Sequence, residues 1–363
     1  CCFGIETKRE VGGIFRVEPK TLRWFEAPYD LVRKMRASFF VLGPLVAKSG
    51  QARVSMPGGC AIGRRPVDIH IKALEKLGVE IAVSHGYVEA HGLELRGAEI
   101  VLDFPSVGAT ENVLMAATLA KGESVIRNAA REPEVSDLAN FLVAMGAKIE
   151  GIGTDVLHVQ GVQSLSGGAY RVIPDRIEAE TFMVAGAMTG GDVTITDATP
   201  DHCTSVIEKL RQIGARLDVT DGKIRVQGPD EFKPVEVSTM PYPGFPTDSQ
   251  AQLMALLTIA KGTSIVKETI FENRFMHVSE LVRLGADITI DGNCAIVKGV
   301  PNLSGSPIMA SDLRASAALI LAGLIARGET EVLRVYHLDR GYEHIEAKLS
   351  ALGANVERFR RGQ

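Results

Sequence analysis

The chain carries a recurring pattern in which an amphipathic helix ends at a glycine and an alternating strand follows. In runs such as IKALEKLG and VIEKLRQIG the apolar positions recur every three or four residues. Each glycine is typical of a helix C-cap, because glycine tolerates the left-handed backbone required there. These glycines are Gly78, Gly146, Gly214, Gly285 and Gly353, separated by 68, 68, 71 and 68 residues. Such even spacing indicates an internal repeat of about seventy residues.

A second pattern lies between these glycines: an alanine-rich helix ends in a glycine and leads into a β-branched strand. It occurs in TLAKGESVI, GAMTGGDVTI, TIAKGTSIV and LIARGETEV, and more loosely in LVAKSGQARV. Together the two patterns predict a repeat of strand, helix, strand, helix and two further strands, which implies sheets covered by helices. Residues 3–19 resemble the end of another repeat, with Gly4 as a helix cap and a hairpin turn at Gly12 and Gly13.

The number of repeats predicts two α/β domains. The 363 residues, of which 45% are hydrophobic, are enough for two separate cores. Five complete second helices and the N-terminal remnant suggest three repeats per domain, with a boundary near Ile173. The predicted domains are residues 1–173, whose first repeat is incomplete, and 174–363, which lacks a strand that would complete it. About fifty residues of the first repeat are expected to be absent.

Each alanine-rich helix is predicted to begin at a polar cluster. The clusters are APYDLVRKMRAS, DFPSVGAT, IPDRIEAET, FPTDSQAQ and ASDLRAS, and their Ser, Asp and Pro residues are typical of helix N-caps. Arg36, Arg176 and Arg314 fall in the first turns, where a cation opposes the helix dipole. A cation is favourable there beside an anion. We therefore expect the helix starts of each domain to converge on an anion-binding face, with plain capping as the alternative.

The segment PGGCAIGRRPVD, residues 57–68, is the strongest candidate for chemistry. Cys60 lies among Gly58, Gly59 and Gly63 and is followed at once by two arginines, which favours an accessible, activated thiol in a mobile lid. Cys203 and Cys294 are instead predicted to be small buried side chains. The five cysteines are odd in number and far apart, so free thiols are expected rather than disulfides or a zinc site.

The overall composition favours small-molecule ligands. The net charge is only −4 and the chain has no stripe of alternating aromatic and basic residues, which argues against a nucleic-acid partner. No apolar stretch reaches the roughly 18 residues that span a bilayer, and the N-terminus has no signal-peptide pattern. A cytoplasmic monomer without a membrane partner is expected.

Eight motifs resemble those of the UDP-N-acetylglucosamine 1-carboxyvinyltransferase family, in the same order, from about residue 3 to the C-terminus. They are PGGCAIGRRPVDIH, DFPSVGAT, NAAREPE, YRVIPDRIE, FPTDSQAQ, ENRFMHV, DLRASAALILAG and YHLDRGYEHIE. The resemblance implies an inside-out α/β barrel of two domains, each with three βαβαββ repeats. It implies transfer of the enolpyruvyl group of phosphoenolpyruvate to the 3-hydroxyl of UDP-N-acetylglucosamine, with release of phosphate and no metal or cofactor. This is the first committed step of peptidoglycan synthesis.

The resemblance also assigns catalytic roles. Cys60 matches the general acid toward the enol methylene, which can also bond covalently to the enolpyruvyl group and is the site that fosfomycin alkylates. A thiol is acidic and nucleophilic enough for both roles, although the adjacent arginines favour the thiolate over the proton donor. Asp248 matches the carboxylate near the sugar hydroxyl, with a helix cap as its alternative, and Arg340 is the third catalytic residue.

Substrate contacts follow from the same resemblance. The implied residues are Arg36, Arg65, Pro66, Val67, Asp68, Ile69, Phe104, Ser106, Val107, Gly108, Ile270, Arg274 and Arg314. Arg36 and Arg65, with Arg340, match arginines around phosphoenolpyruvate, where planar guanidinium groups bind carboxylate and phosphate well. The segments 65–69 and 104–108 match those around the UDP moiety, and Ile270 matches a contact of the sugar. Asp175 and Asp312 match acidic positions at the domain junction, for which a structural role is an equal alternative.

Two alternatives follow from where the chain departs from the family. The shikimate-pathway enolpyruvyl transferase has a similar fold and the same donor, but it lacks the GGCxIG loop. A non-catalytic UDP-sugar-binding protein is the second alternative, because the family's Lys-Asn pair near the N-terminus has no counterpart here and Lys8 lies in another element. For the same reason the 363-residue chain is expected to be weakly active or inactive, and poorly stable.

Overall fold

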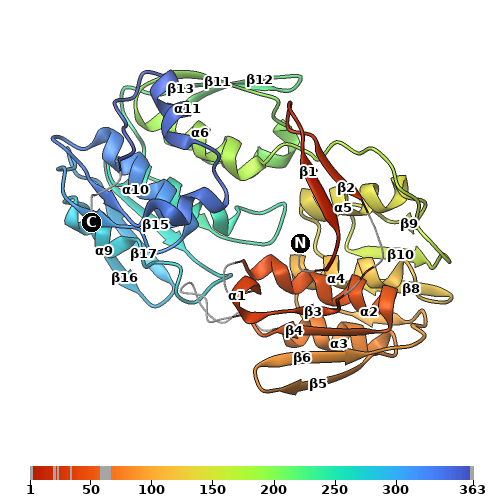
Figure 1. The fold of residues 1–363 in the computed structure, drawn as a ribbon. Helices are drawn as coiled ribbons and strands as arrows, with labels where there is room; N and C mark the ends of the chain where they lie inside the picture. Colours follow the sequence, from red (N-terminus) through yellow and green to blue (C-terminus); the bar gives the residue numbers. More distant parts are fainter. Residues whose placement is uncertain (1–2, 19–21, 23, 33–34, 58–66, 360–363) are drawn as a thin grey trace. The chain divides into compact units, whose positions relative to one another are not determined.

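The structure, a computed structural model, describes residues 3–18, 22, 24–32, 35–57 and 67–359. The chain divides between Ile173 and Pro174 into two compact units, called unit 1 and unit 2 (Figure 1). Three repeats, two in unit 1 and the middle one of unit 2, have the full predicted βαβαββ order among the described residues. Cys60, Arg65 and Pro66 lie outside the described residues, as do Gly58, Gly59 and Gly63 of the predicted lid.

Unit 1 contains a hairpin and two complete repeats. The hairpin is β1 (Glu6–Arg9) and β2 (Phe15–Glu18). The first repeat contains β3 (Glu26–Ala27), α1 (Tyr29–Val32), η1 (Arg36–Val41), α2 (Leu42–Ser49), β4 (Gln51–Ser55), α3 (Asp68–Lys76), β5 (Glu80–Ser84) and β6 (Tyr87–His91). The second contains β7 (Glu99–Val101), α4 (Val107–Ala117), β8 (Glu123–Arg127), α5 (Pro133–Ala144), β9 (Lys148–Glu150) and β10 (Val156–Gln160).

Unit 2 contains three repeats. The first is α6 (Arg176–Met188), β11 (Asp192–Thr196), η2 (Pro200–Cys203), α7 (Thr204–Ile213), β12 (Arg216–Thr220) and β13 (Lys223–Gln227). The second is β14 (Glu236–Ser238), η3 (Thr247–Ser249), α8 (Gln250–Leu257), β15 (Thr263–Lys267), α9 (Val278–Arg283), β16 (Asp287–Asp291) and β17 (Cys294–Lys298). The third is β18 (Ile308–Met309), α10 (Leu313–Ile325), β19 (Val332–Leu333), η4 (Val335–Arg340) and α11 (Ile345–Ala351).

The complete repeats share one sheet topology. In the second repeat of unit 1, β7 pairs in parallel with β8, and β10 lies antiparallel between β8 and β9. The sheets ordered β3-β4-β6-β5 and β14-β15-β17-β16 follow the same plan. The alanine-rich helix therefore connects two parallel strands, and the second helix leads into an antiparallel hairpin.

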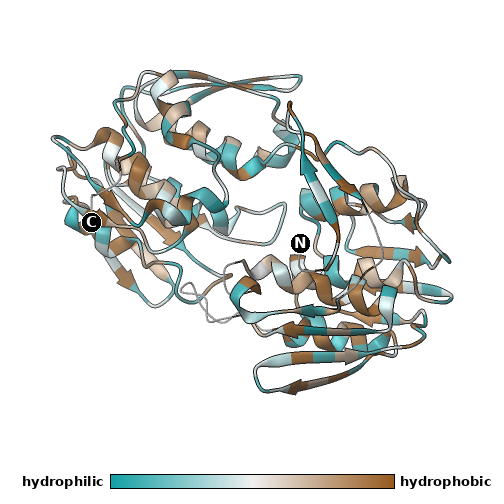
Figure 2. Cartoon of the chain, in the orientation of Figure 1, coloured by the Kyte–Doolittle hydropathy of each residue, from teal (hydrophilic) through white to brown (hydrophobic). Residues whose placement is uncertain are grey.

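The alanine-rich helices lie inside, whereas the second helices, such as α7, bury only one face. All eight residues of α8 and ten of the thirteen residues of α6 are buried, as expected for helices that are apolar on every side. Most of α10 is coloured as hydrophobic in Figure 2. The strands instead alternate, as in β15, where buried and exposed residues follow one another, so one face of the sheet stays open to solvent. The predicted inside-out α/β architecture is confirmed.

The cap glycines adopt the predicted backbone. All five repeat glycines have a left-handed φ, between 87° at Gly78 and 115° at Gly214. Strands follow four of them, but residues 354–359 after Gly353 form no strand, so this part of the prediction is wrong. The sheet of the last repeat has only β18 and β19 among the described residues, and an extended segment becomes a strand only beside a pairing neighbour.

Each unit has its own hydrophobic core. One large cluster draws its residues from the strands and helices of unit 1. A second large cluster and a smaller one around Leu338 and Tyr342 belong to unit 2. A helix long and apolar enough to cross a bilayer is not found in the part of the chain that the structure describes.

Candidate active site

Asp248 lies at the centre of a polar cluster in unit 2. It belongs to the short helix η3 at the start of α8, and its carboxylate meets two arginines from other elements. Oδ1 lies 2.8 Å from Nη2 of Arg274, and Oδ2 lies 3.1 Å from Nη2 and 3.2 Å from Nε of Arg314. Two nitrogens of Arg314 thus share one oxygen of Asp248, while Arg274 takes the other. The predicted catalytic carboxylate and two predicted substrate arginines are therefore brought together.

The charge of Asp248 is stabilised by these arginines. Burial alone would raise the pKa of this carboxyl, but the guanidinium groups of Arg274 and Arg314 outweigh it and hold the pKa well below its usual range. The arginines are more enclosed than the carboxylate: their side chains are 5% and 13% exposed, against 38% for Asp248. The carboxylate of Asp248 is therefore accessible to a ligand, whereas the two arginines that hold it are buried.

Tyr342 supports Arg314 from the side opposite Asp248. The tyrosine is buried, and its hydroxyl accepts a hydrogen bond from Nη1 of Arg314 at 3.2 Å. The same hydroxyl lies 2.8 Å from Oγ1 of Thr181 on α6 and 3.4 Å from Nε2 of Gln252 on α8. The starts of α6, α8 and α10 thus meet in unit 2, as the polar clusters in the sequence predicted.

Arg274 is tied to a second buried carboxylate through a threonine. Nη1 of Arg274 lies 3.4 Å from Oγ1 of Thr247, which donates to Glu268 at 2.8 Å. The other oxygen of Glu268 accepts from Thr239 and from the backbone N–H of Ile270, both at 2.8 Å. Glu268 therefore holds the backbone of Ile270, the predicted sugar contact, in the same network as Arg274.

Glu180 is a buried acid next to the segment that carries Asp248. It lies on α6, is 1% exposed, and accepts a hydrogen bond from the hydroxyl of Ser249, the neighbour of Asp248. Burial raises the pKa of Glu180 to about 7, although Arg176, Ser249 and Arg314 oppose this shift. Glu180 thus gains or loses a proton near neutral pH, in contrast to Asp248.

Asp175 and Asp312 are helix caps. Asp175 accepts from the backbone N–H groups of Ile177 and Glu178 at the start of α6. Asp312 does the same for Arg314 and Ala315 at 3.0 and 3.1 Å at the start of α10. These caps occupy backbone N–H groups that were predicted to bind anions. At α6 and α10 the groups suited to an anion are therefore the arginine side chains rather than the capped amides.

Arg340 ends the short helix η4, and its side chain is exposed. Among the described residues it has no ion-pair partner, unlike Arg274 and Arg314. Its position is set by its neighbours, because Gly341 packs against Leu313 and Tyr342 enters the polar cluster.

In unit 1 the predicted nucleotide segments lie next to each other. Val67 precedes α3, Asp68 and Ile69 begin it, and Ser106 caps α4 by accepting from Ala109. An ion pair of 3.1 Å between Lys72 on α3 and Asp103 links the segments. Phe104 is exposed, while Val107 and Gly108 form the first turn of α4. Arg36 begins η1 in the same unit.

Gly108 has a packing role. A Cβ atom at this position would lie 2.6 Å from the ring of Phe40 and 3.1 Å from that of His70, so a larger residue would force the Phe40 ring to move. His70 in turn lies 3.1 Å from the amide of Asn112, whose Oδ1 accepts from the backbone N–H of Gly43 at 2.6 Å. Asn112 thereby joins α2, α3 and α4 behind the predicted nucleotide segments.

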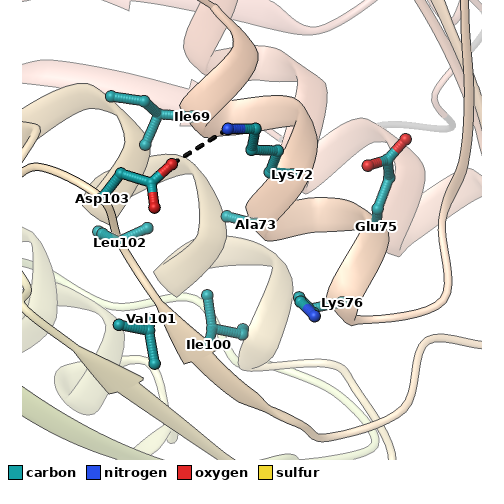
Figure 3. Close-up of a pocket in the computed structure, with 9 residues that line it drawn as sticks. All are labelled: Ile69, Lys72, Ala73, Glu75, Lys76, Ile100, Val101, Leu102 and Asp103. Atoms are coloured by element: carbon teal, nitrogen blue, oxygen red, sulfur yellow. Dashed lines mark hydrogen bonds and ion pairs between the residues drawn. The ribbon is translucent and has the colours of Figure 1, made fainter.

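A shallow pocket on unit 1 lies between α3 and the strand β7 (Figure 3). Lys72 points across it toward Asp103 in Figure 3. It is lined by Ile69, Lys72, Ala73, Glu75, Lys76, Ile100, Val101, Leu102 and Asp103. Of the predicted substrate residues only Ile69 lines this pocket, and its two acidic and two basic side chains favour no one charge of ligand. Within the described ranges, no three side chains of the metal-binding types converge.

The structure separates the two cysteines predicted to be buried. Cys203 is fully buried, and burial strongly raises the pKa of its thiol, which confirms that prediction. Cys294 is partly exposed, so the prediction is wrong there. It is the first residue of β17, directly after the turn that follows β16, where the end of the hairpin is less covered than its middle. Both are free thiols.

Several residues of the cluster were not predicted from the sequence. Thr181 and Tyr342 are 161 positions apart, and Ser249 and Glu180 are 69 apart. Tyr342 and Glu180 lie inside the motifs around Arg340 and Arg176, which was the available clue. His277 is buried next to Arg274, and burial lowers its pKa to about 4, so it is neutral in the folded protein.

Comparison with known proteins identifies close relatives. A family model described as EPSP synthase (3-phosphoshikimate 1-carboxyvinyltransferase) matches residues 2–349. The chain is 59% identical over 333 residues to UDP-N-acetylglucosamine 1-carboxyvinyltransferase 1 of Caldanaerobacter subterraneus subsp. tengcongensis, covering 92% of the chain and 80% of that protein. It is 61% identical over 337 residues to UDP-N-acetylglucosamine 1-carboxyvinyltransferase of Anaeromyxobacter dehalogenans, with the same coverage.

Solved structures share the fold. The crystal structure of the enolpyruvyl transferase NikO from Streptomyces tendae matches with a TM-score of 0.87 at 27% identity, over 98% of this chain and 85% of that one. A structure of EPSP synthase from Acinetobacter baumannii matches with a TM-score of 0.72 at 19% identity, over 98% and 86% of the two chains, a likeness of fold alone.

Proposed function

Because the chain belongs to the UDP-N-acetylglucosamine 1-carboxyvinyltransferase family, we infer that it transfers the enolpyruvyl group of phosphoenolpyruvate to UDP-N-acetylglucosamine. The observation that carries this conclusion is about 60% identity to enzymes of that name over 92% of the chain. The shikimate-pathway alternative is less well supported, since the EPSP synthase structure is similar at only 19% identity.

The reaction is proposed to proceed by addition and elimination. The 3-hydroxyl oxygen of the sugar bonds to C2 of phosphoenolpyruvate while C3 takes up a proton, which gives a tetrahedral ketal. The C2–O bond to phosphate then breaks and C3 loses a proton, which restores the double bond. Two groups are required, one that accepts the hydroxyl proton and one that exchanges a proton with C3. Cys60 is proposed for C3.

Asp248 is proposed to accept the proton of the sugar hydroxyl. Its pKa is too low for an effective base while both arginines hold it, because a good base has a pKa near the working pH. An anionic substrate that draws the guanidinium group of Arg274 away, while Arg314 keeps its place, would raise the pKa of Asp248. Substrate binding would thereby activate the base, which supports a carboxylate flanked by arginines at this point.

The remaining predicted residues are proposed to bind substrate. Arg36, Arg65 and Arg340 would surround phosphoenolpyruvate, and Arg274 and Arg314 would serve the acceptor side of the reaction. The segments 65–69 and 104–108 are proposed to hold the UDP moiety, and an ion pair between Lys72 and Asp103 lies beside their described residues. A monomer in the cytoplasm, acting on these two small molecules, is the proposed working form.

The function is tested by measuring phosphate release from phosphoenolpyruvate with two acceptors, UDP-N-acetylglucosamine and shikimate 3-phosphate. Release with the nucleotide sugar alone is expected, and release with shikimate 3-phosphate would favour the alternative enzyme. Calorimetric binding of UDP-N-acetylglucosamine without any phosphate release would instead indicate the non-catalytic binding protein.

The role of Asp248 is tested with Asp248→Asn, which keeps the shape of the side chain but removes its charge and basicity. We expect kcat to fall by about 100-fold or more, as for other general bases. Asp218→Asn is the matched control, because Asp218 is an exposed strand residue of the same unit. A kcat for Asp248→Asn equal to that of the control would rule out a proton-transfer role.

A further inference from the structure

The hydroxyl of Tyr342 connects three helices of unit 2 at one atom. It contacts Thr181 of α6 at 2.8 Å, Gln252 of α8 at 3.4 Å and Arg314 of α10 at 3.2 Å. Tyr342 is 2% exposed, so water does not compete for these hydrogen bonds. None of the roles proposed above involves this residue.

The hydrogen bonds around the tyrosine form one consistent set of donors and acceptors. The single hydroxyl proton of Thr181 is donated to the carbonyl of Ile177 at 2.8 Å, so Thr181 accepts from Tyr342. Arg314 has only N–H donors and therefore donates to the tyrosine oxygen, as does Nε2 of Gln252, which also donates to Oγ1 of Thr181 at 3.1 Å. In this arrangement the hydroxyl of Tyr342 uses its proton and both lone pairs.

This arrangement leaves Arg314 one orientation. Its Nε and Nη2 donate hydrogen bonds to Asp248, and its Nη1 donates one to Tyr342. A guanidinium group bound at both edges cannot rotate without losing a buried hydrogen bond. Arg314 then presents a fixed pair of donors to Asp248.

Tyr342 also anchors the segment that carries Arg340. Only Gly341 separates the two residues, and a Cβ atom at Gly341 would lie 2.9 Å from Leu313, the neighbour of Arg314. The end of η4 is thereby packed directly on the start of α10. The hydrogen bonds of the Tyr342 hydroxyl hold η4 in this position against α10.

We propose that Tyr342 is a positioning residue, which fixes Arg314 against Asp248 and holds the segment of Arg340 to the starts of α6, α8 and α10. The proposal deepens the proposed function, on which it rests. Tyr342 itself touches no reacting atom and acts through Arg314.

The proposal is tested by a double-mutant cycle that combines Tyr342→Phe, which removes one oxygen atom, with Arg314→Lys, which removes the partner that the oxygen orients. Tyr342→Phe alone should lower kcat by about tenfold, the value of one hydrogen bond to a charged group. In the Arg314→Lys background the same change should cost less than about twofold, because the two residues act as one. Equal losses in both backgrounds would overturn the proposal, since a merely structural role is additive.

Two further variants keep the test clear. Thr181→Val removes the acceptor of the tyrosine proton and should lower kcat less than Tyr342→Phe, because Arg314 keeps its contact. Tyr170→Phe is the matched control in unit 1, where the lost hydroxyl bonds only to Asp137, and it should leave kcat unchanged. A loss with Thr181→Val that exceeds the loss with Tyr342→Phe would contradict the predicted order.

A spectroscopic measurement separates this proposal from the function itself. The carboxyl carbon of Asp248 can be followed by carbon-13 NMR, with its signal assigned by its absence in Asp248→Asn. Tyr342→Phe should raise the pKa of Asp248, which faces Arg274, Arg314 and Glu180, because Arg314 loses its fixed orientation. An unchanged titration would overturn the role of Tyr342 even if no phosphate were released, whereas absent turnover alone would count against the proposed function.

Discussion

Glu180 illustrates how burial sets the chemistry of a single residue. Its carboxyl is enclosed by Ser249, Cys203 and the arginines Arg176 and Arg314, yet burial still raises its pKa to about 7 from 4.5. Asp248 belongs to the same network, but two arginines lower its pKa instead. Two acids of one cluster thus differ in protonation at neutral pH, a pattern that favours separate roles.

The raised pKa of Glu180 predicts a pH-dependent stability. Between pH 4.5 and 7 the folded state keeps a proton that the unfolded chain loses, so the free energy of unfolding should fall as the pH rises. A pKa shift of this size changes the free energy of unfolding by about 3 kcal/mol across that pH range. Glu180→Gln removes this titration while it preserves the acceptor for Ser249. Urea unfolding at pH 5 and pH 8 should therefore give a smaller difference in the variant than in the wild type.

Glu111 provides the internal reference for that measurement. It is a buried acid of unit 1 whose pKa burial likewise raises to about 7, and it is unchanged in the variant. Some pH dependence should therefore persist in Glu180→Gln. An identical pH dependence in wild type and variant would mean that Glu180 does not hold the proton.

Among single residues, the sequence predicts those whose role depends only on their neighbours in the chain. Ser106, Asp175 and Asp312 were recognisable as caps because a cap depends on the next three residues. Asp248, Arg274 and Arg314 were named from a resemblance of motifs. Their contact through one carboxylate was not predictable, because it depends on how η3, α10 and the turn before α9 pack together.

At the scale of elements, the approach of α2 to α4 depends on a single glycine. A Cβ atom at Gly43 would lie 2.3 Å from the backbone oxygen of Asn112 and 2.4 Å from its Oδ1. A backbone atom cannot move aside as a flexible side chain can. The close contact also allows the 2.6 Å hydrogen bond from the N–H of Gly43 to Asn112.

Gly43→Ala should therefore destabilise unit 1 by at least about 2 kcal/mol, since overpacking and a lost buried hydrogen bond act together. The measurement is the urea midpoint of unit 1. Gly167→Ala is the control, because its Cβ would meet nothing within 4 Å, and it should be neutral or slightly stabilising. Equal midpoints for both variants would show that α2 can move away from α4.

The elements were predictable where their signals are local. Amphipathic spacing and cap glycines marked the second helices, and the turn His85–Gly86, in which both residues have a positive φ, closes the hairpin of β5 and β6. The segment after Gly353 carries the same signal but forms no strand. Strand formation depends on a partner elsewhere in the chain, which a local pattern cannot reveal.

At the scale of the molecule, the two units have separate cores. Leu114 is fully buried in the cluster of unit 1, and Leu210 is fully buried in that of unit 2. Their neighbours come from their own unit. A cavity made in one core should therefore leave the packing of the other core intact.

Leu114→Ala and Leu210→Ala should each destabilise one unit by about 2–5 kcal/mol. Hydrogen exchange followed by mass spectrometry reports both units in one experiment. Protection should fall in residues 67–173 for the first variant and in residues 174–359 for the second. Loss of protection throughout the chain in either variant would indicate that the units unfold together.

The apolar helices inside unit 2 also constrain how the protein is synthesised. The helices α6 and α8 leave the ribosome before α10, whose thirteen residues cover them in the finished unit. Until α10 emerges, their buried faces stay exposed to other nascent chains and to chaperones. Slow translation between residues 257 and 313 would lengthen that exposure, so the order of the repeats sets the interval in which the newborn chain is most prone to aggregate.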